Sequence, residues 1–226
     1  FGAMEGNIDY YFMYGPTIKD VVNEYTNLTG KTPLPQLWTL GYQQCRWSYA
    51  PQERAMEIAK SFREKDIPCD TIYLDIDYMD GFRVFTWDNK KFENPKEFLN
   101  ELKEMGFKVV TIIDPGVKVD KGYKIYDEGL KEGHFATDKD GIVYKNCVWP
   151  GDSVFPDFMN SKTREWWAGN QKIMMDLGVA GIWNDMNEPA SFNGPLPDDV
   201  MFNNDGTLVT HKEIHNVYGH MMDKAT

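Results

Sequence analysis

Hydrophobic positions along the chain follow two spacings. Stretches in which apolar residues recur every three or four positions predict helices, and short continuous apolar runs predict strands covered on both faces. Helices are predicted over 16–29, from Pro51 to just past Phe62, from Asn94-Pro95 to Gly106, over 161–177 and over 211–223. Strands are predicted over 37–44, 71–76, 108–113 and 179–183. Strands and helices therefore alternate, as in a parallel α/β fold with right-handed crossovers.

Both a closed (β/α)8 barrel and an open doubly wound sheet fit this order. A complete barrel needs about 250 residues, whereas this chain has 226 residues and only four predicted strands. We therefore predict the N-terminal half of a (β/α)8 TIM barrel, with about four βα units. Residues 1–36 would form an N-terminal flank and linker helix. Residues 37–226 would form the half barrel, with an insertion at about 115–160 and a hairpin turn at 138–141.

Composition and charge narrow the classes of function. With 24 Lys and Arg against 35 Asp and Glu, the net charge is −11, which argues against nucleic acid and anionic membrane as partners. No apolar run approaches the length of a membrane span. The three widely spaced cysteines fit neither a disulfide framework nor a zinc site. The first residues contain no signal-peptide pattern, so a cytoplasmic location is the expectation, although the missing initiator Met indicates a start within a longer protein.

Acidic residues follow three of the predicted strands at their carboxyl ends. Asp75 and Asp77 end one strand, Asp114 ends the next, and Asp185 ends the last, with Glu188 three residues later. Each acid taken alone is more often a turn or cap residue. Three strands in succession favour a shared site instead, because the carboxyl ends of parallel strands meet on one face, where barrel active sites lie.

Three chemistries could use this cluster. Glycoside hydrolysis needs two carboxyl groups and aromatic walls for the sugar, and aromatic residues make up 14% of the chain. A magnesium-dependent phosphotransferase could use Asp75 and Asp77, although Met79 is unfavourable in that motif and no phosphate cradle is visible. A calcium site at Asp75, Asp77 and Asp80 would depart from the EF-hand spacing.

Four motifs resemble glycoside hydrolase family 31, the α-glucosidases that include maltase and isomaltase. The stretch 181–189, Gly-Ile-Trp-Asn-Asp-Met-Asn-Glu-Pro, resembles the nucleophile signature of this family. Residues 40–49, 75–80 and 148–151 resemble three further family motifs and occur in the family's order. Because these motifs span nearly the whole chain, the resemblance implies the family's barrel fold and a catalytic-domain fragment.

The resemblance also implies roles for individual residues. Asp185 would be the catalytic nucleophile that forms a covalent glucosyl-enzyme. Glu188 would orient it, although Glu188 could equally be a structural ion-pair partner. Asp75 would hold the glucose hydroxyls furthest from the scissile bond. The other residues expected to bind or surround the sugar are Ile76, Asp77, Trp47, Trp149, Trp183 and Met186.

The implied activity is a retaining α-glucosidase that releases terminal non-reducing α-linked glucose, through α-1,4 or α-1,6 linkages, from oligosaccharides. The Trp at position 47 favours α-1,6 substrates, because isomaltase-type members of the family tend to have Trp there. No cofactor and no metal are expected. The family's general acid/base lies beyond this chain, so the required partner is the rest of the same polypeptide, and homo-oligomerisation stays open. The alternatives are a family 31 enzyme of altered specificity, such as an α-xylosidase or transglucosidase, and the phosphotransferase.

Overall fold

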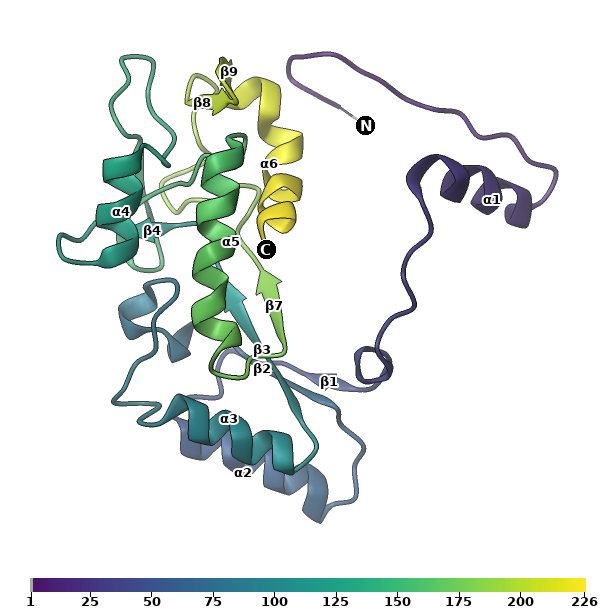
Figure 1. Ribbon diagram of the computed structural model, residues 1–226, viewed down its shortest axis with the longest axis vertical. Coiled ribbons are helices and arrows are strands. Elements are labelled where there is room, and N and C mark those ends of the chain that lie inside the picture. The colour runs from purple at the N-terminus through teal and green to yellow at the C-terminus, as the bar shows by residue number, and fades with distance from the viewer. Residues whose placement is uncertain (1) are drawn as a thin grey trace.

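Most of the N-terminal segment, residues 2–36, stands apart from the body of the molecule, but its first residues contact the last helix of the chain, where Asn216 donates to the Gly2 carbonyl at 2.8 Å and Nζ of Lys212 lies 3.4 Å from Glu5. The computed structural model describes residues 2–226, so Phe1 of the predicted flank lies outside the described residues. Figure 1 shows the segment reaching away from the sheet and carrying α1 (Ile18–Thr29) on its own. The side chains of Thr17 and Asp20 cap α1 reciprocally. No residue of α1 is buried, so its apolar stripe has no partner in the described chain.

The strand predicted over 37–44 is wrong for its first half. Leu37–Leu40 forms a 3-10 turn (η1), because both the amide and the hydroxyl of Thr39 donate to the Gln36 carbonyl. Only Gln43–Gln44 forms a strand, β1. The apolar residues of this stretch therefore lie in a turn, where Leu37 and Leu40 are exposed.

A parallel four-stranded sheet, in the order β1-β2-β3-β7, forms the centre of the fold. Its other strands are β2 (Thr71–Leu74), β3 (Lys108–Ile113) and β7 (Gly181–Asn184). The predicted strand 71–76 ends two residues early, because the Asp75 carboxylate accepts from the Ile76 amide at 2.7 Å and starts the 3-10 turn η2 (Ile76–Tyr78). Within residues 2–226, β1 and β7 each pair on one side only. The sheet is therefore an open arc with two free edges.

Three helices connect these strands: α2 (Gln52–Glu64), α3 (Pro95–Glu104) and α5 (Ser161–Met175). Their apolar stripes join buried strand residues in one hydrophobic core. Leu102 of α3 and Trp167 of α5 are fully buried there. This arrangement of a parallel sheet with connecting helices is the one that the alternating sequence pattern predicts.

The region 115–160 is organised rather than a bare loop. It contains β4 (Val117–Lys118), α4 (Lys124–Glu132), β5 (Lys145–Val148) and β6 (Gly151–Val154). The three strands form a small antiparallel sheet in the order β4-β6-β5. A tight turn closes at the predicted place, where the Asp138 amide donates to the Ile142 carbonyl at 2.7 Å.

The last part of the chain forms a hairpin and a helix. The polar stretch that follows β7 contains β8 (Met201–Asn204) and β9 (Thr207–Thr210), which pair in an antiparallel hairpin. The predicted final helix is α6 (His211–Ala225), and it lies beside α5 (Figure 1). Among residues 2–226, no helix has the length and hydrophobicity needed to cross a bilayer.

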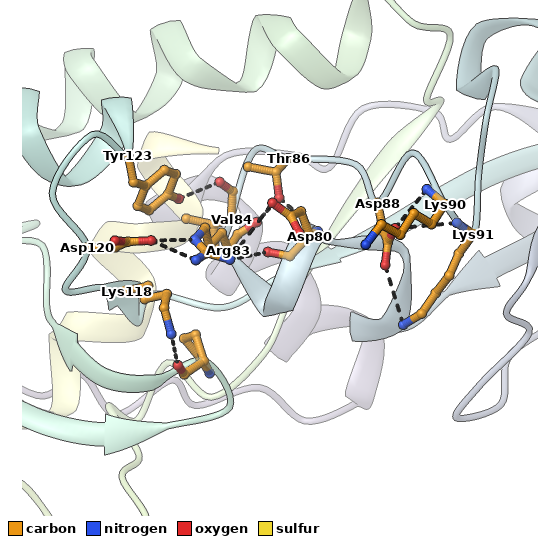
Figure 2. Close-up of polar contacts among 11 residues, drawn as sticks. Asp80, Arg83, Val84, Thr86, Asp88, Lys90, Lys91, Lys118, Asp120 and Tyr123 are labelled. Atoms are coloured by element: carbon orange, nitrogen blue, oxygen red, sulfur yellow. Dashed lines mark hydrogen bonds and ion pairs between the residues drawn. The ribbon is translucent and has the colours of Figure 1, made fainter.

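Polar contacts fasten the loop after β2 to the insertion (Figure 2). Within this loop, η3 (Asp80–Phe82) leads to Arg83, whose Nη2 lies 2.6 Å from Oδ2 of Asp120. The Tyr123 hydroxyl donates to the Val84 carbonyl at 2.6 Å. Lys118 donates to the Pro150 carbonyl at 2.6 Å, in the turn between β5 and β6. An ion pair and a buried hydrogen bond therefore join the loop after β2 to the insertion, and the Lys118 bond stabilises the insertion itself.

Candidate active site

The register of the sheet brings three strand-end acids to one face. Ile113 of β3 is opposite Asn184 of β7, so the next residues, Asp114 and Asp185, stand level on adjacent strands. Leu74 of β2 is opposite Thr111, which places Asp75 level with the residue two positions before Asp114. Since side chains alternate between faces and in-register neighbours share a face, all three acids lie on the same face of the sheet. The convergence predicted from the sequence is present.

Burial and neighbouring negative charge both raise the pKa values of two of these acids. Asp114 is only 6% exposed, and its pKa is raised to about 7, first by burial and then by the negative charges of Asp185, Asp75 and Glu188. Burial also raises the pKa of Asp75, as do Asp77 and Asp185, while the Ile76 amide opposes the shift. None of the ion pairs within residues 2–226 involves Asp75, Asp114, Asp185 or Glu188. The four acidic side chains thus form an acidic cluster with no cation paired to it in the described part.

Asp185 lies at the start of a sharp turn after β7. It is partly buried, and its amide donates to the Ile113 carbonyl at 3.4 Å. Met186 follows with a φ of 54°, in the left-handed region, which redirects the chain away from the strand. Glu188 is exposed beyond this turn. The turn therefore leaves Asp185 partly buried and Glu188 exposed to solvent.

Aromatic side chains form a wall beside the acids. The rings of Trp47 and Trp149 lie 5.7 Å apart between centroids, and Phe192 meets Trp149 edge-on at 4.9 Å and 85°. Trp183 on β7 contacts Tyr73 of β2 at 6.1 Å. Two sets of rings from distant parts of the sequence thus lie by the strand ends, in geometries favourable for aromatic pairs.

Asp77 is engaged by protein groups on both of its oxygens. The indole nitrogen of Trp47 donates to Oδ2 at 2.8 Å, and Nζ of Lys91 lies 3.6 Å from Oδ1. Trp47 is 62% exposed, so this bond holds a ring that otherwise has much freedom. Asp77 in this arrangement acts as an anchor for Trp47. Ile76, by contrast, is 2% exposed and lies in the hydrophobic core, with little surface open to a ligand.

Asp114 was seen in the sequence as a strand-end acid but was not selected as a site residue. Its position after β3 matches that of Asp185 after β7, and that equivalence was the available signal. What the sequence could not provide was the burial of Asp114, which depends on side chains from other elements. Within residues 2–226, no group of three or more His, Cys, Asp or Glu is arranged to hold a metal ion. Carboxyl groups, aromatic rings and partial burial are the means this face has for binding and reacting with a polar ligand.

Comparisons with known proteins show which family this chain resembles. The family model "Glycosyl hydrolases family 31 TIM-barrel domain" matches residues 32–226. Alpha-glucosidase 2 of Bacillus thermoamyloliquefaciens is 53% identical over 228 residues, covering 100% of this chain and 29% of that protein. Neutral alpha-glucosidase AB of Homo sapiens is 40% identical, covering 98% of this chain and 24% of its own length.

Solved structures have the same fold. One is the ER glucosidase II heterodimeric complex, which consists of the catalytic subunit and the binding domain of the regulatory subunit. It superposes with a TM-score of 0.87 at 38% identity, covering 94% of this chain and 23% of that chain. The Flavobacterium johnsoniae GH31 dextranase complexed with glucose gives a TM-score of 0.85 at 34% identity, covering 94% and 26%. The chain spans 23–29% of the length of these relatives. The open sheet is part of an α/β barrel, and the chain belongs to glycoside hydrolase family 31.

Proposed function

We propose that this chain provides the nucleophile-bearing half of the active site of a retaining α-glucosidase. Asp185 would attack the anomeric carbon of a terminal non-reducing glucose and form a covalent glucosyl-enzyme, which water then hydrolyses. The observation that carries the proposal is the position of Asp185. It lies partly buried at the carboxyl end of β7, level with Asp114, on the face where barrel active sites form.

The acids suit an oxocarbenium-like transition state. Positive charge develops at the anomeric carbon, and an acidic cluster without paired cations stabilises that charge. Burial is the first cause of the raised pKa values of Asp75 and Asp114, and the neighbouring acids raise both pKa values further. Asp75 would accept hydrogen bonds from glucose hydroxyls, and Glu188 would orient Asp185 from beyond the turn.

The aromatic wall suits the sugar ring and its leaving group. Trp183 and Met186 flank Asp185 in the sequence and would line the glucose pocket with Trp149. Trp47, which lies against Trp149, would face the leaving group and is anchored by Asp77. The contact of Ile76 with the sugar stays a prediction, since Ile76 is buried in this chain. The remaining barrel strands of the intact polypeptide would pair with the free edges of β1 and β7 and supply the acid/base.

The test is covalent trapping in the intact protein. A fluorinated glucosyl fluoride should label the peptide that contains Asp185, and Asp185→Ala should lower turnover of an aryl α-glucoside by several orders of magnitude. Asp80→Ala is the matched control, because Asp80 is an exposed acid in the loop after β2 and should leave turnover nearly unchanged. A label on another peptide would refute the assignment. Turnover of an α-xyloside in preference to the glucoside would instead indicate a family member of altered specificity.

A further inference from the structure

Asp114 is a buried acid that the proposed chemistry does not yet use. Its side chain is 94% buried, and its Oδ1 has no hydrogen-bond partner. A buried polar atom without a partner destabilises the fold, and in native structures such atoms are few. A carboxyl in this position therefore calls for an explanation beyond packing.

Three acidic side chains lie near Asp114. Asp185 stands level with it at the end of β7, Asp75 comes from the end of β2, and Glu188 from the turn beyond β7. The fully buried phenol of Tyr78 also lies nearby, but its hydroxyl donates to the Ile112 carbonyl. Adjacent parallel strands lie about 4.8 Å apart, so the register sets Asp114 and Asp185 side by side on neighbouring strand ends.

Such a pair of carboxyls shares a proton when it cannot hold two charges. Burial and three neighbouring acids raise the pKa of Asp114 to about 7, so the proton resides on Asp114 up to neutral pH. A protonated carboxyl has one O–H donor, and the acceptor that stands level with it is the Asp185 carboxylate.

We propose that Asp114 is a positioning residue whose carboxyl donates a hydrogen bond to the Asp185 carboxylate and so holds the attacking oxygen in place. This inference rests on the proposed role of Asp185. In the glycosylation step, an Asp185 oxygen bonds to the anomeric carbon as the bond to the leaving group breaks, and the leaving group departs with its electron pair. Asp114 keeps its proton throughout and touches no reacting atom of the sugar.

The test is the pH dependence of covalent labelling in the intact protein by a fluorinated glucosyl fluoride. Fluoride leaves with little need of a proton, so the profile reports on the carboxyls of this face rather than on the acid/base. In the wild type, labelling should slow above about pH 7, as Asp114 loses its proton and with it the donated bond. Asp114→Asn keeps an N–H donor that cannot titrate there. Its labelling rate should stay within about three-fold of the wild type at pH 6 and should not fall above pH 7.

A second variant and a control make the result decisive. Asp114→Ala removes the donor, so its labelling at pH 6 should be about ten-fold slower or more than that of the wild type, and it should not fall further above pH 7. Asp157→Asn is the control, because Asp157 is another buried acid with a raised pKa, about 6, that accepts from the Asn203 and Met159 amides instead. It should leave the shape of the profile unchanged.

Two results would overturn the inference. One is a fall above pH 7 that persists in Asp114→Asn. The other is an Asp114→Ala variant that is labelled at the wild-type rate and slows above pH 7 as the wild type does. If Asp114→Ala does not fold, the Asn profile alone decides. Peptide mapping separates the two proposals, because label on a residue other than Asp185 would defeat the proposed function. If the label is on Asp185 but the pH profile of Asp114→Asn is the same as that of the wild type, only the role of Asp114 is refuted.

Discussion

The bond between Trp47 and Asp77 offers a sharp test of how the aromatic wall is held. The indole nitrogen donates to a carboxylate oxygen at 2.8 Å. Hydrogen bonds to charged groups are worth about 1.5–3 kcal/mol, but Trp47 is 62% exposed, which screens the interaction. We therefore expect a coupling energy of about 1 kcal/mol between the two side chains, or roughly five-fold in kcat/KM.

A double-mutant cycle measures this coupling. Trp47→Phe keeps a ring and loses the N–H, and Asp77→Ala removes the acceptor. Each single variant should lower kcat/KM for a glucose disaccharide in the intact enzyme. The double variant should lose about five-fold less than the product of the single losses. The effect should appear mainly in KM, because the ring is displaced while Asp185 is unchanged.

A matched cycle with Asp80→Ala checks the specificity of the effect. Asp80 belongs to the same loop, but its carboxylate faces Arg83 at 3.9 Å rather than Trp47. Trp47→Phe and Asp80→Ala should be additive within about 0.3–0.5 kcal/mol. If Trp47→Phe and Asp77→Ala are equally additive, the anchoring role of Asp77 is wrong.

Three further predictions concern stability and metal. Leu102→Ala should lower the unfolding free energy by about 2–5 kcal/mol, because Leu102 is fully buried, while exposed Lys103→Ala should change it by less than about 0.5 kcal/mol in the same denaturant titration. The pKa of Asp157 is raised to about 6 in the fold from 3.8. The folded state therefore holds this proton longer, and the contribution of Asp157 to stability falls as pH rises from about 4 to 6, by on the order of 2–3 kcal/mol. Asp157→Asn should remove this fall, and an unchanged difference between pH 4 and 6 would contradict the argument. A chelator should leave glucoside turnover unchanged, whereas a loss that Mg²⁺ restores would favour the phosphotransferase alternative.

The strands that carry the site could be predicted because short continuous apolar runs in the sequence indicate strands buried on both faces. Lys108–Ile113 forms β3 over the predicted range, since its apolar side chains are covered on both faces of the sheet. The end of β2 could not be read in the same way. Asp75 caps the turn that follows, and that bond replaces the strand pairing that the apolar Ile76 suggested.

Elements that depend on local partners were harder to predict. Lys145–Val148 is partly polar and becomes β5 only through its pairing with β6. The helix Lys124–Glu132 was missed because its apolar stripe is short and lies within a region expected to be a loop. In the site, the positions of Asp75 and Asp185 at the carboxyl ends of parallel strands were enough to predict that the two acids lie on one face. The burial of Asp114 depends on contacts from several elements and leaves no pattern in the sequence.

The level pairing of β3 with β7 has a consequence for how specificity can change in this family. Asp75, Asp114 and Asp185 each directly follow a paired strand, so the backbone pairing fixes the spacing of these three positions. Insertions in the turns that follow the strands can therefore reshape the rim of this face without moving the three acids.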